Sequence, residues 1–216
     1  VTNPPIDPLR EKLVMSLEMH LGERCSPFES NDIKPFIHLK SPIINEQELI
    51  SLKESEIKSK TISSLFDIEE GIKGFEAKLD DICKVSEKAI KEGCSLIIIS
   101  DKGVSSKQSF IPPLLAVGAI HHYLLKKEIR LKASLIIETG QCWSTHHLAC
   151  LIGYGVSAVC PWLTLESGRH WLQHPKTQKL IATKKINPLS IDEVQENIKK
   201  ALEDGLRKIL SKIGIS

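Results

Sequence analysis

The pattern of apolar and polar residues becomes regular after residue 60. Short apolar runs that read as buried strands occupy residues 61–66, 95–100, 132–138 and 156–161. Stretches with the three- and four-residue spacing of helices occupy residues 71–93, 113–127, 145–155 and 163–174. Buried strands separated by helices are typical of parallel βαβ units with right-handed crossovers. We therefore predict an α/β fold in which parallel βα units form a partial, barrel-like (TIM-like) domain, with a small open sheet as the alternative.

Two of the predicted helices carry clear end signals. The helix over residues 71–93 ends at Gly93, a typical C-terminal residue. Its apolar stripe consists of Ile72, Phe75, Leu79, Ile82, Val85, Ala89 and Ile90. Near the end of the chain, Ser190 and Glu193 have the spacing of a capping box and predict a helix from Ile191 to about Ile209. A polar connector, beginning at about Pro175, is expected before that helix.

The first 60 residues lack this regularity, and we expect an irregular N-terminal arm that docks on the remainder. The opening VTNPPIDP is rich in proline and is predicted to be extended. In REKLVMSLEMHLG, Leu13, Leu17 and Leu21 recur every four residues and predict a helix that stops at Gly22. Asn45 is a candidate cap for a short helix. The predicted organisation is an arm over residues 1–60, an α/β core over 61–174 and a connector with a helix over 175–216.

Composition narrows the class of protein. The 29 Lys and Arg residues balance 27 Asp and Glu residues and are interleaved with them, which argues against a nucleic-acid partner. No apolar run approaches the roughly 20 residues needed to cross a bilayer, so no membrane association is expected. Six cysteines without a CxxC spacing favour a reducing, cytoplasmic location. Because the chain opens at Val1 rather than at a methionine, we expect it to be part of a longer protein.

Candidate chemistry lies where the buried strands end. Asp101 and Lys102 follow the run SLIIIS, and Glu138 ends KASLIIE, so in a parallel sheet these residues meet at one edge. One interpretation is a general acid and base pair formed by Asp101 and Glu138. The alternative is structural: such acids also cap the next helix or pair with Lys102 and Arg130.

The remaining motifs give no cofactor or metal site. The pairs His121–His122 and His146–His147 cannot easily face one metal ion, because neighbouring helical residues point about 100° apart. We expect one histidine of each pair to pack inward on a backbone partner and the other to meet solvent. The sequence has no GxGxxG after a strand and no GxxxxGK before a helix, and Gly153 and Gly155 lie at a helix end, where an anion is disfavoured.

Four long phrases of the sequence, taken in order, resemble the central domain of glutamate synthase. They are VTNPPIDPLREKLVMSLEMHLGER, SDKGVSSKQSFIPPLLAVGAIHHYL, IIETGQCWSTHHLACLIGYGVSAVCPWLTLE and GLRKILSKIGIS, and the resemblance covers nearly the whole chain. In that family this domain resembles a degenerate copy of the flavin-binding barrel and carries no flavin or iron–sulfur cluster. The resemblance therefore implies a domain that is not catalytic by itself and that connects the glutaminase domain to the FMN-binding synthase domain of the same chain.

The resemblance also implies a role within the parent enzyme. That enzyme hydrolyses glutamine, passes ammonia through an internal tunnel and makes glutamate from 2-oxoglutarate at a site with FMN and an iron–sulfur cluster. Its electrons come from ferredoxin or from a nicotinamide-nucleotide-oxidising subunit, and its location is the cytoplasm, or the plastid stroma in a photosynthetic eukaryote. We expect Thr2 and Asn3 in the wall of the tunnel or between domains, supported by Asp7 and Arg10, with capping of the next helix as the alternative.

A second hypothesis treats the chain as an autonomous small α/β enzyme. Such an enzyme, which is flavin-dependent in one version of the hypothesis, would use Asp101, Lys102 and Glu138 at the strand ends. The two hypotheses differ in what the edge of the sheet does: it is architecture in the first and an active site in the second.

Overall fold

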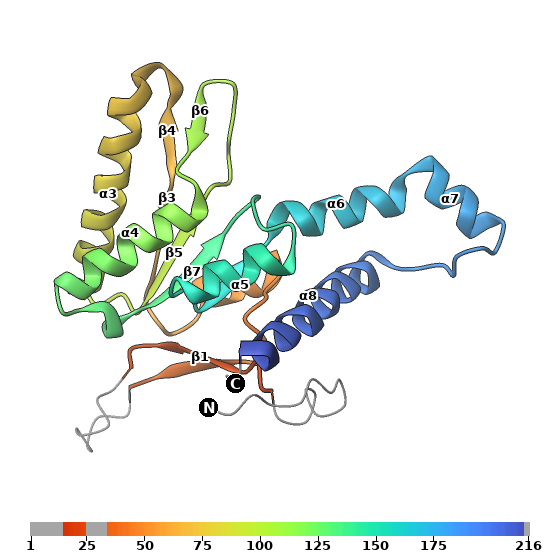
Figure 1. Cartoon of the computed structure of the whole chain (residues 1–216), viewed down its shortest axis with the longest axis horizontal. Coiled ribbons are helices and arrows are strands. Elements are labelled where there is room, and N and C mark those ends of the chain that lie inside the picture. The colour runs from red at the N-terminus through yellow and green to blue at the C-terminus, as the bar shows by residue number, and fades with distance from the viewer. Residues whose placement is uncertain (1–14, 25–33, 214–216) are drawn as a thin grey trace.

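The computed structural model describes residues 15–24 and 34–213 and contains a four-stranded parallel sheet at its centre (Figure 1). The strands are β3 (Ser59–Ser63), β5 (Leu96–Ser100), β7 (Ser134–Glu138) and β8 (Ala158–Cys160), and they pair side by side in this order. All residues of β5, β7 and β8 are buried, as uninterrupted apolar runs predict. The predicted α/β class and parallel βα units are thereby confirmed.

Three helices pack on one face of this sheet. They are α3 (Gly71–Lys91), α4 (Pro113–Lys126) and α5 (Thr145–Gly153), each of which connects one strand of the sheet to a later one. Their apolar residues form one core with the side chains of the sheet that point the same way, among them Ile97, Ile99 and Ile137. A short antiparallel pair, β4 (Leu65–Asp67) and β6 (Gln108–Phe110), extends beside α3 (Figure 1).

The opposite face of the sheet is covered by the N-terminal part of the chain. There β1 (Met19–Gly22) pairs antiparallel with β2 (Phe36–Leu39), and α2 (Glu46–Lys53) follows. Leu21, Leu49 and Leu52 from these elements form a second core with Leu96 and Ile98 of β5. Two backbone hydrogen bonds attach this segment to the free edge of β8. The amide of Val159 donates to the carbonyl of Pro42, and the amide of Ile44 donates to the carbonyl of Val159.

The last three helices lead away from the sheet. Helix α6 (Trp162–Gln173) and α7 (Pro175–Ala182) extend from the body, and α8 (Ile191–Ile213) returns to pack on α5 and α6 (Figure 1). Glycines allow this close approach: a Cβ atom at Gly168 would lie 2.5 Å from Ile198 Cδ1, and one at Gly205 would lie 2.4 Å from Thr145 Oγ1. The predicted capping box of α8 is present, since Ser190 and Glu193 exchange hydrogen bonds.

Three local expectations are corrected by the structure. Residues 19–22 belong to strand β1 rather than to the predicted helix, because Leu17, Met19 and Leu21 also alternate with polar residues as in a strand. The expected connector after Pro175 contains helix α7, which has this proline at its first position, where a proline is well tolerated. The short strand β6 was not expected at all. By contrast, Asn45 caps α2 as predicted, in a full capping box with Glu48.

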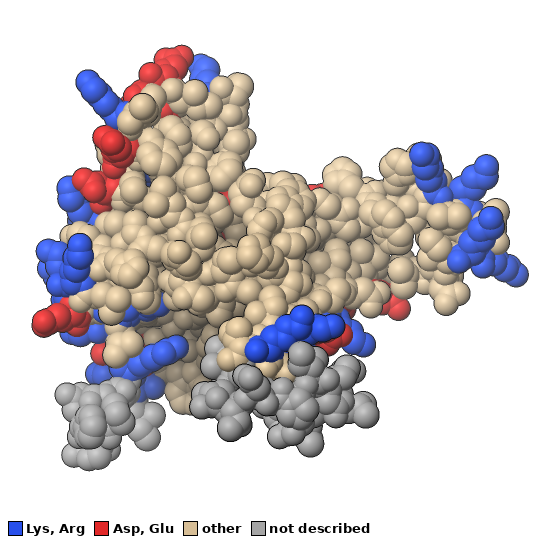
Figure 2. All heavy atoms as spheres, viewed as in Figure 1, with Lys and Arg blue, Asp and Glu red and all other residues tan. Residues whose placement is uncertain are grey.

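On the face shown in Figure 2, basic and acidic residues lie mainly around the periphery, and other residues form the middle. The clearest group of one sign lies at the far end of α6 and α7, where Lys176, Lys179, Lys184 and Lys185 are exposed. Within residues 15–24 and 34–213, no helix has the length and apolar character required to cross a membrane.

Candidate functional site

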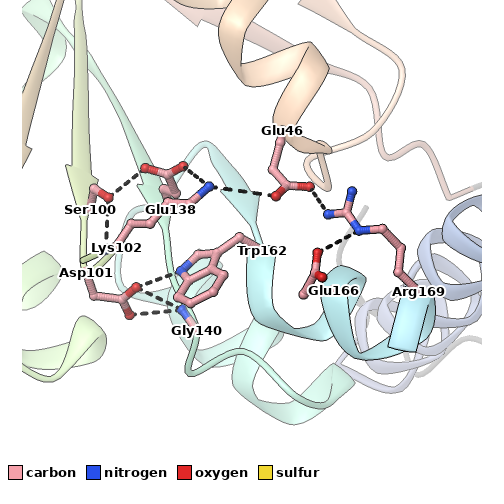
Figure 3. A network of polar contacts seen from close by, with 9 residues as sticks. All are labelled: Glu46, Ser100, Asp101, Lys102, Glu138, Gly140, Trp162, Glu166 and Arg169. Carbon is pink, nitrogen blue, oxygen red and sulfur yellow. Dashed lines mark hydrogen bonds and ion pairs between the residues drawn. The ribbon is translucent and has the colours of Figure 1, made fainter. Parts of the chain in front are cut away.

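The carboxyl ends of β5, β7 and β8 meet at one edge of the sheet, which we call the carboxyl-end rim. The strand register places Ser100 beside Glu138, and Glu138 beside Cys160. Asp101 and Lys102 follow β5, Thr139 and Gly140 follow β7, and Trp162 begins α6 after β8. The sequence prediction that Asp101, Lys102 and Glu138 share one edge is therefore confirmed (Figure 3).

Asp101 is buried and its carboxylate is fully engaged by hydrogen-bond donors. Its Oδ2 accepts from Thr139 Oγ1 at 2.6 Å, and the Gly140 amide donates to both carboxylate oxygens at 2.9 and 3.0 Å. Its Oδ1 also accepts from Trp162 Nε1 at 2.8 Å (Figure 3). These bonds join the segments that follow β5 and β7 to the first residue of α6, which makes Asp101 a structural acceptor at the rim.

Glu138 is buried beside Asp101 but has different partners. Ser100 Oγ donates to its Oε2 at 2.6 Å, and the ammonium group of Lys102 lies 3.9 Å from its Oε1. The same ammonium lies 3.8 Å from Glu46 Oε1 and 5.6 Å from the centre of the Trp162 ring. Lys102 thus contacts acids on β7 and α2 together with the indole that packs beside them.

A second cation extends this network from α2 to α6. Arg169 Nη2 donates to Glu46 Oε2 at 2.6 Å, and Arg169 Nε lies 2.7 Å from Glu166 Oε2 in an ion pair without hydrogen-bond alignment (Figure 3). Burial by itself lowers the pKa of Arg169, but the two carboxylates outweigh burial and raise the pKa above its ordinary value. The guanidinium is therefore held charged between two helices.

The rim network consists of Glu46, Ser100, Asp101, Lys102, Glu138, Gly140, Trp162, Glu166 and Arg169. Every carboxylate in it accepts from, or pairs with, a named partner in the same network. Glu46, Trp162 and Arg169 were not anticipated as members of this network. Glu46 and Arg169 lie on helices away from the strand ends, whereas Trp162 directly follows the end of β8 but carries no motif for this contact. Of the structural partners expected for the acids, Lys102 is confirmed, whereas Arg130 is wrong since its partners lie elsewhere.

Metal ligation has no support in the part of the chain that the structure describes. There, no group of three or more His, Cys, Asp or Glu side chains is arranged to hold an ion. His121 is half-buried and packs against Gly155, but the hydrogen bond that it accepts comes from the Arg130 side chain rather than from the backbone, and His122 is exposed. His146 and His147 are both exposed, so the expectation that one of them packs inward is wrong, although His147 Nδ1 does accept a hydrogen bond from the backbone amide of Trp143 at 3.2 Å.

Buried thiols are equally unsuited to nucleophilic chemistry. Burial raises the pKa of Cys142 to about 12, and burial followed by the charge of Asp80 raises the pKa of Cys83 to about 11. Both thiols therefore stay protonated near neutral pH. The expected tunnel residues Thr2, Asn3, Asp7 and Arg10 lie outside the described residues.

The fold and the rim together define the class of protein. It is an α/β domain of parallel βα units in which the acidic residues at the strand ends bind other helices and strands of the same domain. Comparison with known proteins gives the family. The model of the glutamate synthase central domain family matches residues 1–216, and the chain belongs to this family. This confirms the resemblance inferred from the sequence.

Three relatives illustrate the match. The chain is 48% identical to a ferredoxin-dependent glutamate synthase of Pyropia yezoensis, 47% to ferredoxin-dependent glutamate synthase 2 of Synechocystis sp. and 44% to a chloroplastic ferredoxin-dependent glutamate synthase of Oryza sativa subsp. japonica. Each match covers 100% of this chain and 14% of the relative. The chain therefore spans about a seventh of the length of these relatives. A match to one solved structure, an aldolase from Escherichia coli K12, covers 78% of this chain and 65% of the aldolase chain, with 13% identity and a TM-score of 0.29.

Proposed function

We propose that the chain is the central connecting domain of a ferredoxin-dependent glutamate synthase and joins a glutaminase domain to an FMN-binding synthase domain. The observation that carries the proposal is the family match over residues 1–216, combined with relatives in which the whole chain occupies 14% of the length. In this proposal the parent enzyme makes glutamate from glutamine and 2-oxoglutarate. The central domain holds the two catalytic domains in register and helps to form the path of ammonia between them.

The proposal includes a barrel-like core. Its support is the order of the strands, β3-β5-β7-β8, which follows the chain without a switch, and the position of α3, α4 and α5 in one core on one face. In a βα barrel, strands follow in sequence and helices form the outer layer, whereas a doubly wound sheet reverses direction and has helices on both faces. The inner face would then be filled by α2 and by the β1–β2 pair. The proposed arm over residues 1–60 contains these elements, ahead of a core over 61–174 and a connecting segment over 175–216.

Cofactors and partners follow from the parent enzyme. We assign FMN and an iron–sulfur cluster to the parent and neither to this domain. Ferredoxin as the electron donor is supported by the names of the relatives, several of which are called ferredoxin-dependent, and this favours it over a nicotinamide-nucleotide-oxidising subunit. A location in the plastid stroma, for a photosynthetic eukaryote, is supported by relatives named chloroplastic; the cytoplasm is the location otherwise. The other proposed partners are the two catalytic domains of the same chain. We propose no nucleic-acid or membrane partner.

The rim is architectural in this proposal. Asp101 already accepts from three donor groups, and Glu138 and Lys102 are engaged with Ser100 and Glu46. A general acid or base must lie within hydrogen-bond reach of the substrate proton that it transfers, and both oxygens of the buried Asp101 carboxylate instead face donors of its own domain. These contacts argue against the autonomous enzyme, which would use the same three residues.

We further propose that Thr2 and Asn3 contribute to the wall of the ammonia path, with Asp7 and Arg10 supporting them. A path of this kind needs a wall that excludes water and a few polar groups that let neutral ammonia pass. The test is the Thr2→Val substitution in the full-length enzyme, with glutamine hydrolysis and glutamate formation measured in the same reaction. We expect more than one glutamine to be hydrolysed for each glutamate formed, because ammonia escapes from a disturbed path.

The same substitution at Thr61, an exposed position on β3, serves as the control and should leave the ratio unchanged. If Thr2→Val lowers both rates in equal proportion, the role in the ammonia path is wrong. The connecting role would then have to be judged by separate measurements on the rim.

A further inference from the structure

A polar cluster lies at the opposite end of the sheet from the rim. At the amino ends of β7 and β8, on the side where Ser134 Oγ bonds to Gly22 of β1, there is a cavity of about 280 Å³. Its apolar lining includes Leu125, Leu131, Ile152 and Val156, and its basic lining consists of Arg24, His121 and Arg130. Nothing in the proposed connecting function accounts for these basic groups.

Among the described residues, the hydrogen-bond partners of Arg130 are all neutral acceptors. Its Nε donates to His121 Nδ1 at 3.0 Å, its Nη1 to the Ala133 carbonyl at 2.8 Å and its Nη2 to the Gly155 carbonyl at 2.6 Å. A guanidinium has five N–H donors, so two remain for another acceptor. The side chain is therefore held in one orientation while part of its hydrogen-bonding capacity is unused.

In the described part of the chain, no acidic side chain pairs with the positive charges around this cavity. Among residues 15–24 and 34–213, no carboxylate forms an ion pair with Arg130 or Arg24. Burial lowers the pKa of Arg130, and repulsion by the charge of Arg24 lowers it further. The carboxyl ends of α4 and α5 contribute partial negative charge, about −0.5 each. They offset one guanidinium at most, and within the described residues no carboxylate pairs with the other.

We propose that this cavity binds a small organic carboxylate, with its oxygens on Arg130 and Arg24 and its short carbon chain against the apolar wall. The planar fork of a guanidinium matches the two oxygens of a carboxylate. The volume of about 280 Å³ lies just below the usual range for ligand pockets, which favours a small ligand. His121 accepts from Arg130 through Nδ1, so it stays neutral and orients the guanidinium rather than contributing a charge.

The experiment is a calorimetric titration of the 216-residue chain with acetate, butyrate, neutral butyramide and inorganic phosphate, together with NMR detection of the His121 ring. We expect saturable binding of butyrate that is roughly fourfold tighter than acetate for each added methylene, because each buried methylene contributes a similar free energy. Butyramide should not bind. The His121 ring signal should move with the same dissociation constant, which places the ligand in this cavity.

Variants separate the site from general charge effects. Arg24→Gln removes one exposed charge and should weaken butyrate binding roughly tenfold. Lys107→Gln, an exposed position far along the chain, is the matched control and should bind as the wild type does. Arg130→Gln should abolish butyrate binding. If that variant does not fold, the affinity of Arg24→Gln and the shift of the His121 signal still test the proposal.

Three results would overturn the proposal. They are the absence of saturable butyrate binding by the folded wild-type chain, equal affinity in Arg24→Gln, and binding that leaves the His121 signal unmoved. Tighter binding of phosphate than of butyrate would overturn the choice of a carboxylate. None of these results bears on the connecting role, which rests on other residues.

Discussion

Replacing Asp101 with alanine is the sharpest perturbation of the rim. The alanine leaves three donors without their acceptor: the hydroxyl of Thr139, the amide of Gly140 and the indole nitrogen of Trp162. The hydroxyl can rotate to another acceptor, but the two N–H groups are fixed by the backbone and by the packed indole. Each buried donor left unsatisfied costs about 1–3 kcal/mol, so we expect Asp101→Ala to lower the free energy of unfolding by about 3 kcal/mol.

Asparagine at the same position separates the charge from the hydrogen bonds. Its carbonyl oxygen can accept from Gly140 and Trp162, while its amide donates to the Thr139 hydroxyl. We therefore expect Asp101→Asn to cost only about 1 kcal/mol, the difference between a charge-assisted and a neutral hydrogen bond. The order of the two variants follows from the geometry and not from the size of the side chains.

The assay is urea-induced unfolding followed by far-UV circular dichroism, with the shift in midpoint converted to free energy at a common slope. Asp81→Ala, on the exposed face of α3, is the control and should change stability by no more than about 0.5 kcal/mol. If Asp101→Ala lowers the free energy of unfolding by less than about 1 kcal/mol, the reasoning is refuted, because the Asp101 carboxylate would then have no structural role.

Further predictions concern helix packing and pH. Gly205→Ala should lower the free energy of unfolding by about 1–3 kcal/mol, because the new methyl group would overlap Thr145. Gly153 lies at the end of α5 with open space around it, so Gly153→Ala should raise the free energy of unfolding by up to about 1 kcal/mol. Thermal unfolding of both variants checks this pair. Burial, followed by the charge of Arg130, lowers the pKa of His121 below its ordinary 6.5, so the unfolded chain binds more protons and stability falls as pH drops through that range. Unfolding at a series of pH values should show a shallower fall for His121→Gln, and an unchanged slope would contradict it.

The three inner strands β5, β7 and β8 could be predicted from the sequence because they are buried on both faces, and such runs have few other interpretations. The strand expected over residues 61–66 is less accurate, since the structure divides this stretch between β3 and β4. The failures have equally physical causes. Leu17 and Leu21 are four residues apart, a spacing that satisfies both the helical period and the strand period, and tertiary pairing with β2 selected the strand. Helix α7 is polar enough to read as a loop, and the three residues of β6 gain their structure only by pairing with β4.

The candidate site was predictable only in part. Parallel strands place their carboxyl ends together, so Asp101 and Glu138 could be placed at one edge from the sequence alone. The partners that decide what these acids do, Glu46, Trp162 and Arg169, come from α2 and α6. Their approach depends on how the N-terminal segment and the last helices pack, which no local pattern specifies.

The central claim, that the rim is architecture rather than an active site, is tested most directly in the full-length enzyme carrying Lys102→Gln together with Glu138→Gln. Glutamine hydrolysis and glutamate formation are measured separately, after thermal unfolding has shown that the variant is folded. Our account predicts that both rates stay within about twofold of the wild type, since neither side chain meets a substrate. A fall of roughly a hundredfold or more in either rate, the loss typical of removing a general acid or base, would contradict it.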